Sequence, residues 1–300
     1  MESSSYFIKD KAIFGSYPNQ QSVYELEKMG VKYFVDLTLP DEKKIVPYIT
    51  TQKCLNFPIY DQNVPMDLRT FFRFILQITR IIRELRVDEK IYIHCKGGHG
   101  RAGLVVACIL CYIFSLTPYE SLQYTSECHN NRKNMRERWR KIGSPQTYSQ
   151  KKFVYKSFHP VNMNVIVKHL LSEKSLPENK NIQDYFSEYK EKFLENSSDK
   201  FFSQFIKKNK VIPSLDFDTS YLDTVITIEW DDVKDNILRH LILNFFNNNT
   251  EVKEHFMKSF LRPIIITYIE HNVFWKNHGI GITKISNILK NIRVKFLQDN

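Results

Sequence analysis

The chain of 300 residues is poor in cysteine, glycine and tryptophan, with 5, 9 and 3 of them. An odd, small number of cysteines argues against a disulfide scaffold and favours a reducing compartment. With so little glycine, 42% hydrophobic residues and 25% charged residues, the chain is neither collagen-like nor a coiled coil nor mainly disordered. We therefore expect globular structure, and the length favours two domains.

Long hydrophobic runs are also missing. The longest, 102–114, is too short to cross a bilayer, so no membrane span is expected. The first six residues, Met-Glu-Ser-Ser-Ser-Tyr, lack the basic start and apolar stretch of a signal peptide. We expect a soluble intracellular protein, cytoplasmic or nuclear. The richness in Asn and Lys is typical of an AT-rich coding genome such as that of a large DNA virus.

Acidic residues are scarce in the first half of the chain. Residues 1–160 hold 24 of the 43 Lys and Arg but only 15 of the 33 Asp and Glu, a net charge of +9, which leaves +1 for the rest. Such an excess favours an anionic partner: a phosphorylated protein, a phosphoinositide or a nucleic acid. Plain solubility is the alternative explanation of the same charge.

Short strands and helices alternate along this first half. Strand patterns occupy 12–15, 31–37, 55–60 and 90–94, and helical patterns occupy 22–29, 68–85, 101–115 and a segment that begins at 117. The alternation predicts an α/β fold in which helices flank a central, mainly parallel sheet on both faces. The second half predicts a mostly helical domain, with a strand at 225–230, a helix ending after Phe246 and a last helix from Thr283. We place the two domains at 1–164 and 165–300.

A glycine-rich segment, His94-Cys-Lys-Gly-Gly-His-Gly-Arg101, separates a predicted strand from a predicted helix. A loop of this kind at a helix N-terminus directs backbone N–H groups at an anion, with the helix dipole behind them. These groups favour the thiolate of Cys95, and Arg101 can bind two phosphate oxygens. Cys95 is thus placed to attack phosphorus. The other residues expected in the phosphate-binding loop are His94, Lys96, Gly97, Gly98, His99 and Gly100.

The segment resembles the signature of the cysteine-dependent protein tyrosine phosphatases, His-Cys-x5-Arg with glycine three residues after the cysteine. Upstream, 57–65 is similar to the proline-bounded general-acid loop of the dual-specificity members, with Asp61 in the acid position. The resemblance covers about residues 5–158, and the short stretch before Asp61 favours the compact dual-specificity type. It implies that Cys95, Arg101 and Asp61 are catalytic, and that phosphotyrosine and phosphoserine or phosphothreonine are hydrolysed through a cysteinyl-phosphate.

A third segment, Ser-Pro-Gln-Thr-Tyr-Ser-Gln at 144–150, is similar to the Gln-Thr-x-x-Gln segment with which many of these phosphatases position the hydrolytic water. Gln146 and Gln150 are the candidates for that role. The family usually has serine or threonine directly after the signature arginine, where this chain has Ala102. Because that hydroxyl helps the cysteine to leave, the resemblance implies slow breakdown of the phosphoenzyme.

Positive charge surrounds the predicted site. Lys96 and His99 would add charge at the rim of the loop, and a basic stretch follows at 132–141. That stretch could bind acidic substrate flanks or RNA, or form a solvated helix face. Cys108 and Cys111 lie in an apolar helix and are interpreted as buried small side chains. No cysteine has ligands at metal-like spacing, so neither a metal nor a cofactor is expected.

The second half of the chain contains fewer motifs that point to a function. Residues 185–297 show a degenerate resemblance to NADAR-type domains, linked to ADP-ribose and N-glycoside chemistry, through Trp230, Glu270 and the Phe-Trp pair at 274–275. Lys276 departs from the glycine of that pattern, and an expected aspartate is missing. The alternative is a helical accessory domain in which Trp275 belongs to the core.

The sequence therefore predicts a protein phosphatase acting on phosphotyrosine and phosphoserine or phosphothreonine. Two alternatives stay open. One is a phosphatase of RNA 5′ ends or phosphoinositides, which the basic first half favours. The other is an inactive phosphate-binding module, for which Ala102 argues.

Overall fold

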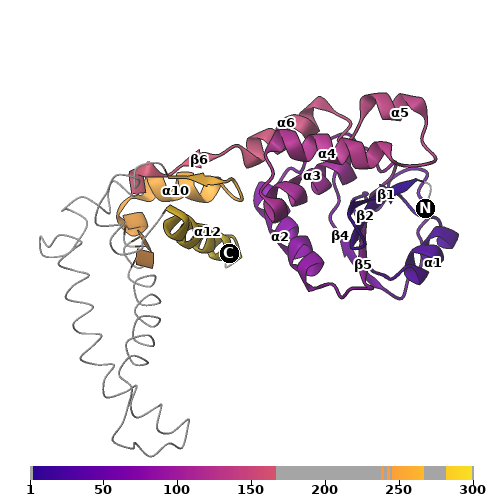
Figure 1. Cartoon of the computed structure of the whole chain (residues 1–300), viewed down its shortest axis with the longest axis horizontal. Helices are drawn as coiled ribbons and strands as arrows, with labels where there is room; N and C mark the ends of the chain where they lie inside the picture. Colours follow the sequence, from indigo (N-terminus) through magenta and orange to yellow (C-terminus); the bar gives the residue numbers. More distant parts are fainter. Residues whose placement is uncertain (1–2, 167–237, 240–241, 244, 267–281, 299–300) are drawn as a thin grey trace, which may run out of the picture. The chain divides into compact units, whose positions relative to one another are not determined.

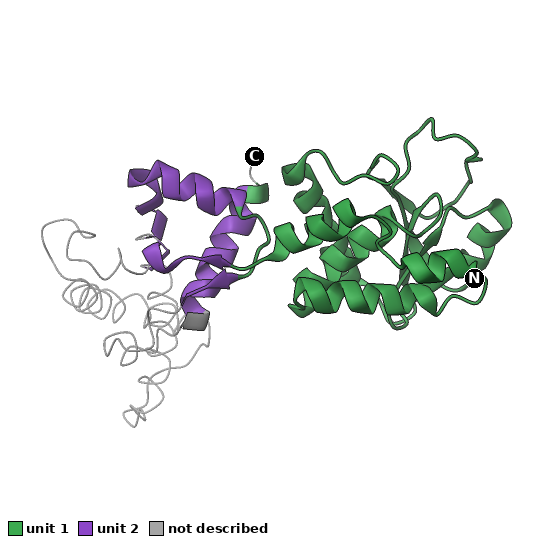
Figure 2. Cartoon of the chain, turned by 90° about the horizontal axis from the view of Figure 1, so that it is seen from above, with its two compact units in different colours: residues 1–160, 259–263, 297–300 green, residues 161–258, 264–296 purple. Residues whose placement is uncertain are grey.

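The computed structural model describes residues 3–166, 238–239, 242–243, 245–266 and 282–298. The chain divides into two compact units, shown in green and purple in Figure 2. The first comprises residues 1–160 with 259–263 and 297–300, and the second comprises 161–258 and 264–296. Within the described ranges, no helix is both long and apolar enough to cross a membrane.

A five-stranded sheet forms the middle of the first unit, in the order β1-β2-β5-β3-β4. Its strands are β1 (Ser4–Ile8), β2 (Ala12–Ser16), β3 (Val31–Asp36), β4 (Lys53–Asn56) and β5 (Lys90–Cys95). Only the pair β1 and β2 is antiparallel. The predicted mainly parallel sheet is confirmed, and β2, β3, β4 and β5 all end at one edge.

Helices cover both faces of this sheet (Figure 1). They are α1 (Gln20–Lys28), α2 (Leu68–Glu84), α3 (Arg101–Phe114), α4 (Pro118–Asn130), α5 (Glu137–Ile142) and α6 (Tyr148–Phe158). On one face, α1 buries Val23 and Leu26 against Ile13, Phe34 and Tyr92. On the other, α3 is buried from its first residue to Cys111, as its almost uninterrupted apolar sequence predicts.

Two strands differ from the prediction. The edge strand β1 was not expected, because its sequence Ser-Ser-Tyr-Phe-Ile has a weak apolar pattern and buries only Phe7. The run predicted at 55–60 enters the sheet earlier, as β4, and leaves it at Asn56. Beyond that point the backbone N–H groups of Phe57 and Ile59 still bond to the carbonyls of Asp36 and Leu37. This anchors the segment that carries Asp61.

The described part of the second unit is mostly helical. It contains β6 (Val161–Asn162) parallel to β7 (Ile264–Ile265), α10 (Thr250–Lys258), α12 (Ile282–Gln298) and helical residues between 238 and 248. Its core includes Ile166, Leu238, Phe246, Phe256, Ile285 and Leu289.

The predicted end of one helix at Phe246 is wrong. The helix continues through Asn248, and the chain turns only at Asn249, whose side chain donates to the Phe245 carbonyl. Asparagine is tolerated in the last turn of a helix and caps it by such a bond. The strand predicted at 225–230, Trp230, Glu270 and the 274–276 segment lie outside the described residues.

Candidate active site

The glycine-rich loop lies at the carboxyl edge of the sheet, where ligands bind in open α/β folds. Strand β5 ends at Cys95, which is paired in the sheet with Ser16 and is only 2% exposed. The loop then runs from Lys96 to Gly100, and α3 begins at Arg101. The structure thus confirms the strand, loop and helix order that the sequence predicts.

Three backbone carbonyls of this loop accept hydrogen bonds from groups outside it. Lys96 O accepts from the Tyr17 N–H (3.1 Å), Gly98 O from Arg132 Nη1 (3.0 Å) and His99 O from the Ser144 hydroxyl (2.6 Å). In a trans peptide the C=O and N–H point in opposite directions. The N–H groups of Gly97, His99 and Gly100 are therefore turned to the inner side of the loop. This is the orientation that the anion cradle expected from the sequence requires.

Gly98 is the position at which the loop requires glycine. Its φ is +72°, in the left-handed region. A Cβ there would lie 2.3 Å from the carbonyl carbon of Gly15 and 2.5 Å from the backbone nitrogen of Ser16. The loop can therefore pack this closely on the end of β2 only because residue 98 has no side chain.

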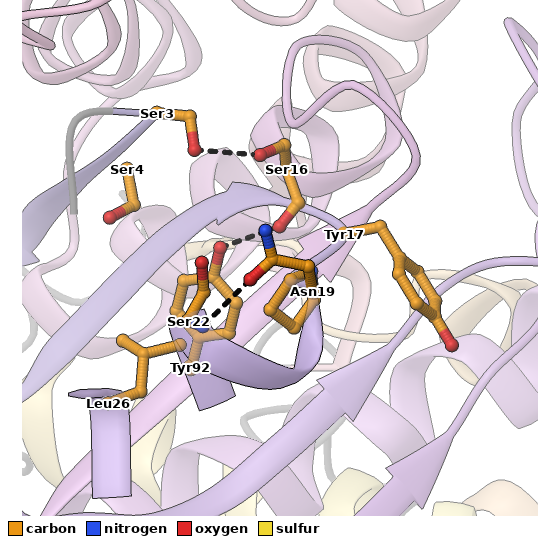
Figure 3. Close-up of a pocket in the computed structure, with 9 residues that line it drawn as sticks. Ser3, Ser4, Ser16, Tyr17, Asn19, Ser22, Leu26 and Tyr92 are labelled. Atoms are coloured by element: carbon orange, nitrogen blue, oxygen red, sulfur yellow. Dashed lines mark hydrogen bonds between the residues drawn. The ribbon is translucent and has the colours of Figure 1, made fainter. Parts of the chain in front are cut away.

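The support under the loop is polar. The Tyr92 hydroxyl donates to the Ser16 carbonyl (2.6 Å), and the Ser16 and Ser3 hydroxyls are hydrogen-bonded (2.8 Å), as Figure 3 shows. They line a cavity of about 200 Å³ with Tyr17 and Asn19. Burial raises the pKa of Tyr92, so its hydroxyl stays a donor. These bonds hold the turn that brings the Tyr17 N–H to the loop.

Arg101 is 1% exposed, and its contacts leave one donor unused. Nη1 donates to Glu42 Oε2 (2.6 Å) and to the Ile59 carbonyl (3.0 Å). Nη2 donates to Glu42 Oε1 (2.8 Å) and lies 3.0 Å from Asp61 Oδ1. The Nε–H is buried and has no hydrogen-bond partner among the described residues. Because a buried unpaired donor is costly, this N–H is available to an anion that enters the site.

Glu42 was not predicted as a site residue. Its side chain is 9% exposed, and its carboxylate binds both terminal nitrogens of Arg101. The hydrogen bond from Arg101 lowers the pKa of Glu42. Although burial opposes the charge of Arg101, the bond to Glu42 and the charges of Cys95, Glu42 and Asp61 raise its pKa overall. Nothing in the local sequence distinguishes Glu42, which lies in a polar loop 59 residues before Arg101.

Asp61 lies next to Arg101, as the predicted acid role requires. Its side chain is 59% exposed, and its carboxylate forms an ion pair with Nη2. A phosphate bound by Arg101 would compete with this carboxylate for the same nitrogen. The exposed carboxylate of Asp61 therefore lies at the mouth of the site, and the ion pair with Nη2 is the contact that an entering anion would replace.

His94 is buried behind Cys95. Its Nε2 is 2.9 Å from the Tyr48 hydroxyl, and its Nδ1 is 3.7 Å from Asp36 Oδ1. Burial lowers the pKa of His94 to about 3, so the ring is neutral. Burial also raises the pKa of Asp36, which accepts two bonds from Thr38. His94 thus contributes packing and polarity but no charge.

The positive charge predicted at the rim of the loop is only partly present. Lys96 reaches the carbonyl of Lys43 with its Nζ (2.8 Å). His99 instead stacks on Trp139 and bonds to His129 (2.8 Å). Burial, and then the charge of Arg132, lower the pKa of His99 to about 4. The expected charge on His99 is wrong, because packing against neighbouring rings keeps it neutral.

The two predicted glutamines both lie against Gly100. A Cβ at Gly100 would be 3.0 Å from both amide atoms of Gln150 and 3.4 Å from Oε1 of Gln146. Gln150 is fully buried and engaged at both ends, since it accepts from the Thr147 N–H and donates to the Asn63 carbonyl. This Thr-x-x-Gln arrangement is the capping box of α6. In the described part of the chain, the amide of Gln146 makes no hydrogen bond, which leaves it available.

The basic stretch at 132–141 is not uniformly solvated. Arg132 is 2% exposed, and Arg140 donates to the backbone carbonyls of Asn130 and Arg132. Lys133, Arg136 and Arg138 are exposed. Two of the six cations therefore bond to backbone carbonyls, which neither of the sequence interpretations included.

Two further expectations concern α3. Ala102 is fully buried in its first turn. Cys108 and Cys111 are buried, and burial raises the pKa of both thiols, that of Cys111 to about 11. The Cys111 thiol lies 3.0 Å from the Ser121 hydroxyl of α4. Both cysteines thus act as packing residues.

The family described as "Swiss Army Knife protein, DSP-PTPase phosphatase domain" matches residues 3–154. "Putative tyrosine phosphatase 197R" of Invertebrate iridescent virus 6 is 42% identical over 156 residues, which are 51% of this chain and 53% of that protein. "Putative tyrosine phosphatase 067L" of Invertebrate iridescent virus 3 is 41% identical over 160 residues, 53% of this chain and 66% of that protein. This chain thus spans about half to two thirds of the length of these relatives.

Among solved structures, "Crystal structure of Tk-PTP in the active form" is 24% identical. The similarity covers 51% of this chain and 97% of that one, with a TM-score of 0.39.

Proposed function

The chain belongs to the family of dual-specificity and tyrosine phosphatases, and from this premise we propose that it hydrolyses phosphate monoesters through a cysteinyl-phosphate on Cys95. The proposed substrates are phosphotyrosine and phosphoserine or phosphothreonine in proteins. The observation that carries the proposal is the cradle itself. Inward N–H groups, the unpaired Nε–H of Arg101 and the Cys95 sulfur all lie within residues 95–101, from the end of β5 to the start of α3.

In the first step the Cys95 thiolate attacks phosphorus while the bond to the leaving oxygen breaks. The leaving oxygen takes the proton of the Asp61 carboxyl group. Arg101 binds the equatorial oxygens through Nε and Nη2 after Asp61 has moved off Nη2. Glu42 meanwhile keeps the guanidinium in place through both terminal nitrogens.

In the second step water attacks phosphorus and the P–S bond breaks, which returns the Cys95 thiolate. The Asp61 carboxylate takes a proton from that water and is ready for the next turnover. Gln146 is the better candidate for positioning the water, because its amide is free whereas the amide of Gln150 is used by the capping box.

For residues 165–300 we propose a mostly helical accessory domain. Its described residues pack a core of aliphatic and aromatic side chains, which supports that assignment. An intracellular site of action, in the host of a large DNA virus, remains part of the proposal. The two relatives from iridescent viruses support the viral origin.

The test is a substrate panel with the full chain. A phosphotyrosine peptide, a phosphothreonine peptide, an RNA 5′-triphosphate and a phosphoinositide are assayed side by side, with Cys95→Ser as the control. Serine is not ionised near neutral pH, so turnover should fall by about 10⁴-fold or more while vanadate still binds. Turnover of Cys95→Ser within tenfold of the native rate would contradict the covalent mechanism. Turnover of RNA or phosphoinositide alone would replace the proposed protein substrates.

A further inference from the structure

We propose that Thr147 and Gln150, at the start of α6, are positioning residues of the general acid, which hold the turn that carries Asp61 against the helix. This assignment rests on the proposed function of Asp61 as the acid and deepens it. The sequence marks Gln150 only through its likeness to a water-positioning segment, whereas the structure gives it a different partner.

The first support is a pair of hydrogen bonds between α6 and the turn. Gln150 Nε2 donates to the Asn63 carbonyl (3.1 Å), and the Thr147 hydroxyl donates to the Gln62 carbonyl (3.3 Å). Both acceptors belong to the two residues that directly follow Asp61. The backbone after the acid is therefore tied at two consecutive positions to the N-terminus of one helix.

The second support is the fixed orientation of the Gln150 amide. Gln150 is fully buried, and its Oε1 accepts from the Thr147 N–H (3.1 Å) while its Nε2 faces the Asn63 carbonyl. A backbone N–H can only donate and a carbonyl can only accept, so these two partners allow one orientation of the amide. The side chain thus links the first turn of α6 to the turn that follows Asp61.

The third support is the conformation of that turn. Gln62 has φ of +61°, in the left-handed region that is unfavourable for a glutamine. The turn closes through Asn63, whose N–H donates to the Tyr60 carbonyl (3.1 Å) and whose Nδ2 donates to the Asp61 carbonyl (3.1 Å). A backbone conformation of this kind persists where surrounding contacts hold it. The two bonds from α6 are such contacts.

The fourth support is the anchor on the other side of Asp61. The Ile59 N–H donates to the Leu37 carbonyl (3.1 Å), and the Ile59 carbonyl accepts from Arg101 Nη1 (3.0 Å). The backbone is thus held before and after Asp61, while the Asp61 side chain is 59% exposed. A general acid must lie within hydrogen-bond reach of the leaving oxygen, so loss of the α6 anchor should misplace it.

The test compares two substrates in the full chain: a phosphoserine peptide, whose leaving oxygen needs a proton, and 4-nitrophenyl phosphate, whose leaving group does not. Gln150→Met removes both amide bonds at similar side-chain size. Glu120→Met is the matched control, because Glu120 has the same capping-box position in α4, where its carboxylate bonds to Thr117. Thr147→Asp keeps an acceptor for the helix cap but cannot donate to the Gln62 carbonyl.

For Gln150→Met and for Thr147→Asp, kcat/KM on the phosphoserine peptide should fall about tenfold, because a small displacement of a catalytic group is costly. The same constant on 4-nitrophenyl phosphate should change little. Glu120→Met should keep the native ratio between the two substrates. Added to Asp61→Asn, Gln150→Met should cause no further loss specific to the peptide, since residues that act as a unit are not additive.

A folded Gln150→Met protein, judged by circular dichroism and melting temperature, would overturn the proposal if it lost activity equally on both substrates or on neither. A fall in kcat on both substrates with unchanged kcat/KM would assign Gln150 to the second step, as a group that orients the water. A residue that only stabilises the fold would lower the melting temperature without changing the ratio between the substrates. If Gln150→Met does not fold, the same ratio in Thr147→Asp decides.

The result for Asp61→Asn separates this proposal from the proposed function. If Asp61→Asn loses activity equally on both substrates, the acid role fails and the positioning role fails with it. If Asp61→Asn is selective for the peptide and Gln150→Met is not, only the positioning role fails.

Discussion

Two buried arginines act on the same loop from opposite sides, and they differ in partners rather than in burial. Arg101, on the inner side, is 1% exposed and binds the carboxylates of Glu42 and Asp61. Arg132, behind the loop, is 2% exposed and binds backbone carbonyls and a hydroxyl. The pKa of the first is raised, and burial lowers that of the second to about 10.

The difference shows how each side of the loop can be used. On the inner side a cation with an exchangeable carboxylate partner can pass from Asp61 to a phosphate at little cost, because one anion replaces another. Behind the loop, the described residues place no carboxylate against Arg132 that a phosphate could replace, and the neighbouring histidines are neutral. That side is suited to holding the loop, and the inner side to binding and chemistry.

The largest effect expected from the inner side is that of Asp61→Asn. Without the acid, kcat on phosphoserine peptides should fall by about 10²- to 10⁴-fold. 4-Nitrophenyl phosphate, whose leaving group is stable as an anion and needs no proton, should lose much less. Steady-state rates on the two substrates give the comparison. An equal loss on both would show that Asp61 positions Arg101 rather than donating a proton.

Glu42→Gln tests whether the function of Arg101 depends on its ion pair with the carboxylate of Glu42. A hydrogen bond between charged groups contributes about 1.5–3 kcal/mol, so kcat/KM should fall by roughly ten- to a hundredfold. Arg101 would then hold Asp61 more tightly against an incoming phosphate, which should also weaken inhibition by inorganic phosphate. The exposed neighbour Asp41 provides the control, since Asp41→Asn should change neither constant. A native kcat/KM in Glu42→Gln would remove Glu42 from the site.

Ala102→Ser tests the hydroxyl that this chain lacks at the first turn of α3. If phosphoenzyme breakdown limits turnover, the new hydroxyl should raise kcat by about tenfold by stabilising the Cys95 thiolate as it leaves. The ratio kcat/KM, which reports the first step, should change little. Rapid-quench kinetics on an aryl phosphate should show a burst in the native protein. An absent burst together with an unchanged kcat would mean that the substitution is silent.

The smallest expected effect is on the free energy of unfolding, through His129, which lies behind the loop. Burial and the charge of Arg132 lower the pKa of His129 to about 3, although an unfolded chain protonates histidine near pH 6.5. As pH falls from about 6.5 toward 3, protons bind the unfolded state first. The folded state should lose up to about 1.4 kcal/mol per pH unit through this residue.

Urea unfolding at pH 7 and pH 5 measures this loss. His129→Gln should lose less stability over that interval than the native chain, whereas His159→Gln, at an exposed histidine, should lose as much as the native chain. Equal losses in all three proteins would contradict the assignment of a neutral, buried His129.

The features of the fold and the site that could be predicted from the sequence are those that depend on residues close together in the chain. The run from His94 to Arg101 contains the proposed nucleophile, the glycines and the cation within eight residues, so an anion-binding loop could be predicted from the local sequence alone. Helix α4 was predictable for the same reason, since Thr117 and Glu120 form its capping box and Pro118 occupies its first position. Gln150 carried the same signal, because Thr147 and Gln150 cap α6, but its likeness to a water-positioning segment suggested another role.

Contacts between distant segments explain what the sequence could not show. Glu42 reaches Arg101 across 59 residues and Arg132 reaches Gly98 across 34, and neither pair has a local pattern that marks it. The charge state of His99 likewise depends on Trp139 and His129, which surround it only after α4 and α5 have packed. Sequence thus decided which groups are available for the proposed chemistry, since their identity is covalent. Tertiary structure decided which groups are desolvated and paired, since burial exists only in the folded chain.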